Sequence, residues 1–146
     1  MRHILVIAAT AALSAAFVGT AAADRVYHTE HLELSGVGGA PGGGMVVNIH
    51  PNGPSVYAHE IYTLRKAVPG TYQVVLNLFP TSLNCTGSST PIPTATITTN
   101  ATGNGQADVK FTPADAAALR GMTISIKWTV AGPAMYVTTC TVVTLD

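Results

Sequence analysis

A period-two alternation of apolar and polar residues is the feature that most constrains this chain, because such alternation is typical of half-buried β-strands. Residues 122–130 are the clearest case: Trp128 and four other apolar side chains fall on one face, and Thr, Ser and Lys fall on the other. The same period recurs over residues 72–79 and 105–111. We therefore expect an all-β chain in which Trp128 lies in the core.

Further strands are expected at residues 26–34, 45–49, 56–64, 94–99 and 135–145, with Gly- and Pro-rich turns between them. Residues 35–44 hold six glycines and predict a mobile connection. One short helix is predicted near residues 113–120, since Thr112 can cap it and Gly121 can end it. Short strands at regular spacing favour an immunoglobulin-like Greek-key β-sandwich of about 7–8 strands.

A resemblance supports this architecture. Residues 96–111 read as a strand, a Gly-rich turn and a second strand, and they resemble a segment found in many secreted bacterial immunoglobulin-like domains. The whole of residues 55–146 resembles small secreted proteins of high-GC bacteria whose activity is uncharacterised. The resemblance implies an immunoglobulin-like β-sandwich and carries no site residues.

The first 23 residues predict a secretory signal peptide. Arg2 and His3 precede an apolar run from Ile4 to Val18, and three alanines then offer a cleavage site before Asp24. An uncleaved membrane anchor is the alternative, but no basic stop-transfer residues follow directly after the alanines. We expect residues 1–23 to be removed, leaving residues 24–146 as one secreted or cell-envelope domain without membrane insertion.

The two cysteines, Cys85 and Cys140, are expected to form one disulfide, because export leads to an oxidising compartment. Closing that loop is worth about 4 kcal/mol in the chain-entropy model. Neither cysteine belongs to a Cys-x-x-Cys pair, which disfavours a thiol oxidoreductase.

Charge and motifs exclude several function classes. The predicted mature chain carries six basic and seven acidic residues without a basic cluster, so we expect no nucleic-acid partner. No phosphate-binding loop or nucleophile elbow is present, and we expect neither a cofactor nor catalysis. The partner is then an unidentified extracellular or cell-surface molecule.

Four histidines of the predicted mature region are candidate metal ligands. His28 and His31 belong to a cluster with Glu30 and Glu33, and a third ligand would come from His50 or His59. The favoured interpretation of this cluster is a polar edge strand whose charges discourage aggregation. Zn or Cu binding is therefore an alternative, and no metal site is predicted.

Residues 56–64 contain the candidate binding residues Tyr57, His59, Glu60 and Tyr62. If Ala58 and Tyr62 face the core, Glu60 faces it too; in the opposite register, His59 does. A bulge could turn both outward. A buried Glu60 would need an internal partner such as Lys127, Arg65 or a hydroxyl.

Three function hypotheses follow. The first is a secreted, non-catalytic β-sandwich that acts as a binding or cell-envelope-associated module. The second is an extracytoplasmic Zn- or Cu-binding protein that uses the histidines. The third is a small secreted hydrolase built around His59 and Glu60, which requires both side chains to share a concave pocket.

Overall fold

Nine strands make up most of the described chain in the computed structural model, which describes residues 25–52 and 56–145 and their side chains over 29–50 and 56–145. The predicted signal peptide, residues 1–23, lies outside these ranges. The strands are β1 (Arg25–Gly36), β2 (Gly43–Asn52), β3 (Ala58–Arg65), β4 (Thr71–Phe79), β5 (Thr90–Thr98), β6 (Gly105–Phe111), β7 (Thr123–Ala131), β8 (Met135–Val137) and β9 (Thr141–Thr144).

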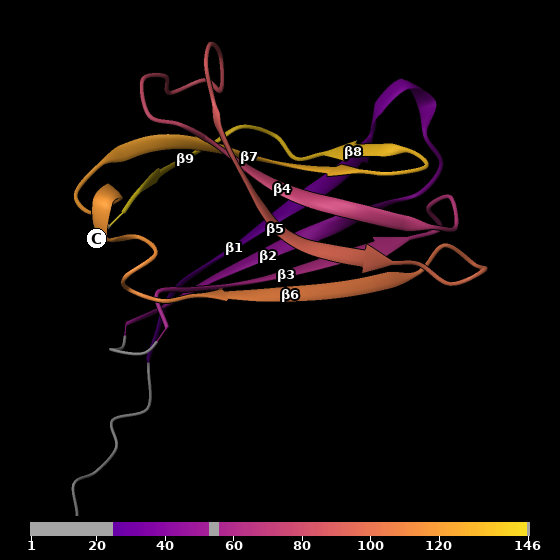
Figure 1. Cartoon of the computed structure of the whole chain (residues 1–146), viewed down its shortest axis with the longest axis horizontal. Helices are drawn as coiled ribbons and strands as arrows, with labels where there is room; N and C mark the ends of the chain where they lie inside the picture. The colour runs from indigo at the N-terminus through magenta and orange to yellow at the C-terminus, as the bar shows by residue number, and fades with distance from the viewer. Residues whose placement is uncertain (1–24, 53–55, 146) are drawn as a thin grey trace, which may run out of the picture.

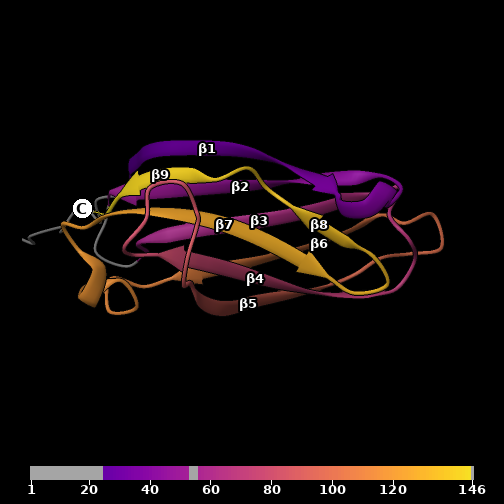
Figure 2. The ribbon, with the colours of Figure 1, turned by 90° about the horizontal axis from the view of Figure 1, so that it is seen from above.

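All strand pairs are antiparallel and belong to one sheet, in the order β5-β4-β7-β8-β1-β2-β3-β6, with β9 also paired to β7. The two ends of that order, β5 and β6, contact each other without pairing. The sheet therefore curls until it is nearly closed, like a barrel around one interior (Figures 1 and 2).

The all-β prediction is confirmed, whereas the immunoglobulin-like Greek-key sandwich is not. Two halves of the sheet are joined where β1 pairs with β8 through only two residues, Ser35 and Gly36. This short ladder makes one sheet out of what would otherwise be two. Periodicity in the sequence defines the faces of strands and cannot reveal which strand edges meet.

The last predicted strand, residues 135–145, is divided into β8 and β9. Between them Thr138 leaves the regular ladder: its N–H donates to the Trp128 carbonyl, and its hydroxyl accepts from the Trp128 N–H. The side-chain hydroxyl thus replaces a main-chain acceptor. Cys140 follows in this interruption, where the chain is free to turn toward the β4–β5 loop.

The predicted disulfide between Cys85 and Cys140 is present, with a Cα–Cα distance of 5.7 Å. It joins the β4–β5 loop to the connection between β8 and β9. Ser125, predicted to face outward, is fully buried under that loop: its hydroxyl donates to the Ser82 carbonyl and accepts from the Cys85 N–H.

The predicted helix near residues 113–120 is reduced to a 3-10 turn, η2 (Ala117–Leu119). Asp115 closes the preceding turn by accepting hydrogen bonds from both the N–H and the hydroxyl of Thr112. A segment this short cannot sustain a regular α-helix without packing along one side. The segment instead lies across one end of the interior, near β9 (Figure 1).

The Gly-rich connection of residues 35–44 is a tight hairpin link that contains a second 3-10 turn, η1 (Val37–Gly39). Gly42 has a φ of 73°, and a Cβ there would lie 2.3 Å from the Arg65 carbonyl oxygen. Close approach to the chain after β3 therefore explains this glycine. Within residues 25–52 and 56–145, no helix has the length and apolar character needed to span a membrane.

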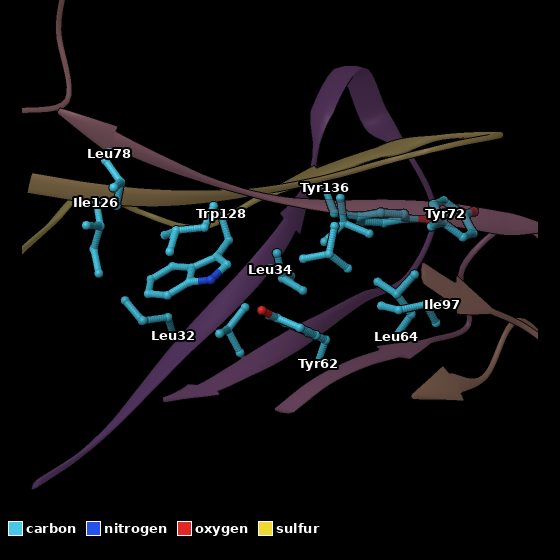
Figure 3. Close-up of a cluster of buried hydrophobic side chains, with 14 of the residues drawn as sticks. Leu32, Leu34, Tyr62, Leu64, Tyr72, Leu78, Ile97, Ile126, Trp128 and Tyr136 are labelled. Carbon is cyan, nitrogen blue, oxygen red and sulfur yellow. The ribbon is translucent and has the colours of Figure 1, made fainter. Parts of the chain in front are cut away.

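The core fills the interior of the sheet along the inward faces of its strands. Trp128, Val130, Ile124 and Ile126 of β7 are buried, as the alternation predicted. Figure 3 shows Trp128 and Tyr62 near the middle of this core, with Tyr72 and Tyr136 toward one end and Leu78 and Ile126 toward the other.

Candidate functional site

Three polar residues lie side by side on the inward face of neighbouring strands. The register pairs Glu30 of β1 with Asn48 of β2, and Asn48 with Glu60 of β3. Directly opposed residues on antiparallel strands share a face and have Cβ atoms about 5 Å apart. We call Glu30, Asn48 and Glu60 the polar row; Leu32, Val46 and Tyr62 on the same inward faces are buried core residues.

Glu60 is the buried carboxylate of this row, with 2% of its surface exposed. The Trp128 indole Nε1 donates to its Oε2 at 2.7 Å, and the Tyr62 hydroxyl donates to the same oxygen. The Tyr62 oxygen also lies 2.9 Å from the Thr94 hydroxyl of β5, across the interior. No described residue donates to the other oxygen, Oε1.

Burial raises the pKa of Glu60 to about 7. The hydrogen bonds from Tyr62 and Trp128 lower this pKa in part, and the negative charge of Glu30 raises it. Burial, together with the adjacent Glu60 charge, also raises the pKa of Tyr62, so that its hydroxyl remains a proton donor. Of the partners predicted for a buried Glu60, the hydroxyl is the one found.

Asn48 is also 2% exposed, and its amide is only half satisfied. Its Nδ2 donates to Glu30 Oε2 at 3.4 Å. Its Oδ1 is buried and has no hydrogen-bond partner among the described residues. A buried acceptor without a donor costs about 1–3 kcal/mol, and such atoms are uncommon in folded proteins.

Asn48 and Glu60 line a cavity of about 280 Å³ whose other walls are mainly apolar. The cavity occupies one end of the interior, between the β2–β3 side, the β4 and β7 side and the segment that carries η2. Its lining comprises Asn48, His50, Tyr57, Ala58, Glu60, Leu76, Leu78, Ile92, Phe111, Asp115, Ala116, Leu119, Ile124, Ile126, Val143 and Leu145.

The less buried part of the lining carries aromatic and charged groups. The rings of His50 and Tyr57 meet edge to face, with centroids 6.4 Å apart. The Arg120 guanidinium lies 5.9 Å from the centre of the Tyr57 ring. The exposed Asp115 also borders the cavity. The polar row thus lies deeper in the interior than this aromatic and charged group.

The four candidate binding residues do not all lie on the same side of the sheet. Glu60 and Tyr62 face the interior and Tyr57 lines the cavity, whereas His59 lies on the outer face, where its Nε2 is 3.0 Å from Asp108 Oδ2 of β6. Ala58, Glu60 and Tyr62 face inward, which is the first of the two registers that the sequence allows, and no bulge occurs in the pairing of β3 with β2. The hydrolase hypothesis requires His59 and Glu60 to share a pocket, and in the structure they do not.

The candidate metal ligands are not brought together in the described part of the chain. His31 is exposed on the outer face of β1, His59 lies on the outer face of β3, and His50 lines the cavity. The side chain of His28 lies outside the described residues, although its backbone is paired with that of His50. No three His, Cys, Asp or Glu side chains in residues 29–50 and 56–145 are grouped to hold a metal ion.

Sequence reasoning missed Asn48 and the donor role of Trp128. A usable signal existed for Asn48, because it follows Val46 at the period of an inward face and is the polar exception there. No such signal existed for Trp128, since residue 60 and residue 128 meet only when β3 and β7 face each other across the interior.

Comparison with known proteins adds no assignment to this geometry. No protein-family model, curated protein or solved structure matches the chain. The function is therefore argued from the polar row and its cavity.

Proposed function

We propose that this protein is a secreted, non-catalytic binding module that holds a small, largely apolar molecule in the cavity above the polar row. One observation carries the proposal: a cavity with mainly apolar walls is lined by the buried polar side chains of Asn48 and Glu60, and the Asn48 Oδ1 acceptor has no donor among the described residues. Ligand pockets characteristically combine apolar walls with a few convergent polar groups.

Binding explains the arrangement better than catalysis. Glu60 accepts hydrogen bonds from Tyr62 and Trp128, which hold it in place, and the neighbouring His59 is turned to the other face. Export fits the disulfide, which is typical of oxidising compartments. Retention at the cell envelope would be compatible with the same role.

Binding of N-phenyl-1-naphthylamine, a neutral apolar dye whose fluorescence rises in apolar surroundings, tests the proposal. We expect saturable binding with one site per chain, displacement by heptan-1-ol, and a change in the fluorescence of Trp128, the only tryptophan. Two substitutions of residues that line the cavity should block it: Ala116→Phe in the η2 segment and Ala58→Leu in β3.

Ala114→Phe is the matched control, because Ala114 is exposed in the same segment and does not line the cavity. Circular dichroism should show that all variants are folded. Absence of saturable binding to the wild-type protein would overturn the proposal. Unchanged binding by folded Ala116→Phe and Ala58→Leu variants would do the same, because the dye would then be bound elsewhere.

A further inference from the structure

We propose that the ligand of this cavity carries an ammonium group on its apolar body, and that Glu60 Oε1 and Asn48 Oδ1 receive that group. This inference rests on the proposed binding function and adds the chemical class of the ligand. An alkyl or arylalkyl amine has the required composition: an apolar part for the walls and a cationic group with several N–H donors for these two acceptors.

Two neighbouring side chains that line the cavity, those of Asn48 and Glu60, each carry an acceptor without a donor from the described residues. Tyr62 and Trp128 both donate their hydrogen bonds to Oε2 of Glu60, so Oε1 has no donor from the described residues. Asn48 Oδ1 is likewise without a partner. The two residues are directly opposed in the β2–β3 register and both line the cavity. A ligand that only accepts hydrogen bonds would leave both atoms unsatisfied.

Glu30 sets the orientation of the Asn48 amide. Its Nδ2 points to Glu30 Oε2 at 3.4 Å, so that its oxygen is the atom left for the ligand. Reversing the amide would place its oxygen against the Glu30 carboxylate and remove that hydrogen bond. Glu30 is therefore a positioning residue that presents an acceptor, not a donor, beside Glu60.

Charge around the polar row favours a cation. Besides Glu60, the ionisable groups of the described residues around the polar row and the cavity are Glu30 from β1, His50 from β2, Tyr57 just before β3, Tyr62 from β3 and Asp115 from the segment after β6. The described residues of β4, β5 and β7 contribute apolar side chains, the Thr94 hydroxyl and the Trp128 indole. Among the side chains that the structure describes, no Lys or Arg lines the cavity, and the Arg120 guanidinium lies over the Tyr57 ring.

These groups discriminate against other ligands of the same size. A carboxylate would meet the like charge of Glu60 in the cavity wall, which is unfavourable at short distance in a buried site. An alcohol could donate only one hydrogen bond and would not neutralise Glu60. An ammonium can donate to both acceptors, and hydrogen bonds between charged groups are about twice as strong as neutral ones.

Isothermal titration of the purified, disulfide-bonded protein with heptylamine, heptan-1-ol and heptanoate at pH 8 tests the inference. At this pH Glu60 is mostly ionised, and an alkylamine, with a pKa close to that of lysine at about 10.4, is protonated. We expect heptylamine to bind about 10- to 100-fold more tightly than heptan-1-ol. Heptanoate should bind most weakly.

Glu60→Gln should abolish the preference for the amine and leave heptan-1-ol binding within about threefold of wild type. Glu33→Gln is the matched control, because Glu33 is exposed on the outer face of β1; it should keep the full preference. The wild-type comparison of the three ligands does not depend on how well Glu60→Gln folds.

Equal affinities for heptylamine and heptan-1-ol, or a preference for heptanoate, would overturn this inference and leave the proposed binding function standing. A preference for the amine that survives in folded Glu60→Gln would overturn it too. If none of the three ligands binds and the dye does not bind either, the proposed function fails, and this inference fails with it.

Discussion

The two ends of the interior are enclosed by the same sheet but are filled differently. At one end, which we call the packed end, Leu34, Leu64, Tyr72, Ile97 and Tyr136 are at most 1% exposed and fill the space (Figure 3). At the other, the cavity end, smaller or less buried side chains leave about 280 Å³ next to the polar row. Trp128 and Tyr62 lie between the two ends.

The polar atoms of the packed end are satisfied by main-chain groups close to the ends of strands. The Tyr72 hydroxyl donates to the Val68 carbonyl at 2.6 Å, and the Tyr136 hydroxyl donates to the Pro41 carbonyl at 2.7 Å. Their rings pack with centroids 5.8 Å apart. In the described residues of this end, large side chains fill the interior and the two tyrosine hydroxyl groups are hydrogen-bonded within the protein.

The cavity end has neither the close packing nor the full set of hydrogen bonds found at the packed end. Ala58 and Ala116 contribute short side chains to its walls, and Asn48 Oδ1 has no donor from the part of the chain that the structure describes. The disulfide and the η2 segment also lie toward this end of the strands. The packed end is therefore held together by close packing of large side chains, whereas the cavity end has looser packing and a space bordered by polar side chains.

The largest effects should come from shortening matched leucines at the two ends. Leu64 of the packed end is 1% exposed, and Leu76, which borders the cavity, is 8% exposed. Within the range of about 2–5 kcal/mol for buried Leu→Ala substitutions, Leu64→Ala should lie near the upper limit and Leu76→Ala near the lower. Urea unfolding followed by Trp128 fluorescence measures both. Equal losses would contradict the distinction between the ends.

Removing the disulfide should come next and should act mainly on the cavity end. Because Cys85 and Cys140 are separated by 55 residues, the double variant Cys85→Ser/Cys140→Ser should lose about 4 kcal/mol of unfolding free energy. Hydrogen exchange should rise most in the β4–β5 loop and around β9, and least around Tyr72 and Tyr136. A uniform rise along the chain would show that the two ends are not independent.

Glu60 should make the stability of the cavity end depend on pH. Its folded-state pKa is raised from 4.5 to about 7, so the folded protein holds a proton that the unfolded chain releases over this interval. The unfolding free energy should therefore fall as the pH rises from about 4.5 to 7, by about 3 kcal/mol from this group. Glu60→Gln should remove that decrease. Parallel pH profiles for the two proteins would be inconsistent with a buried, protonated Glu60.

The smallest effect is expected on the outer face of the same strand. His59 and Asp108 form a solvent-accessible pair, and such pairs contribute about 0–1 kcal/mol. Asp108→Asn should change the unfolding free energy by about 0.5 kcal/mol and leave dye binding unchanged. A marked loss of binding would place the functional site on the outer face of β3 and not in the interior.

Much of the fold could be predicted from local patterns. The alternation around Trp128 identified the inward face of β7, and the two cysteines identified the disulfide. The prediction that a buried Glu60 needs an internal partner also proved useful, since a hydroxyl, that of Tyr62, supplies one. These features depend on residues within one strand or on the chemistry of a unique pair.

Other features depended on contacts between distant strands. Closure of the sheet depends on the two-residue ladder between β1 and β8, which has no signature of its own in the sequence. The polar row exists only because the registers of β1, β2 and β3 bring residues 30, 48 and 60 into line. A shift of one residue in either pairing would have turned one of them outward.

Local sequence patterns are enough to specify that the chain forms strands, which face of β7 is buried and which cysteines pair. Those properties follow from side-chain periodicity and from the presence of only two thiols. Contacts between distant strands are needed to form one nearly closed sheet and to bring Glu60 into hydrogen-bond contact with Trp128, 68 residues later in the chain. The tertiary structure also decided where the interior remains unfilled, because a cavity is a property of how side chains from many strands fit together and of no single segment.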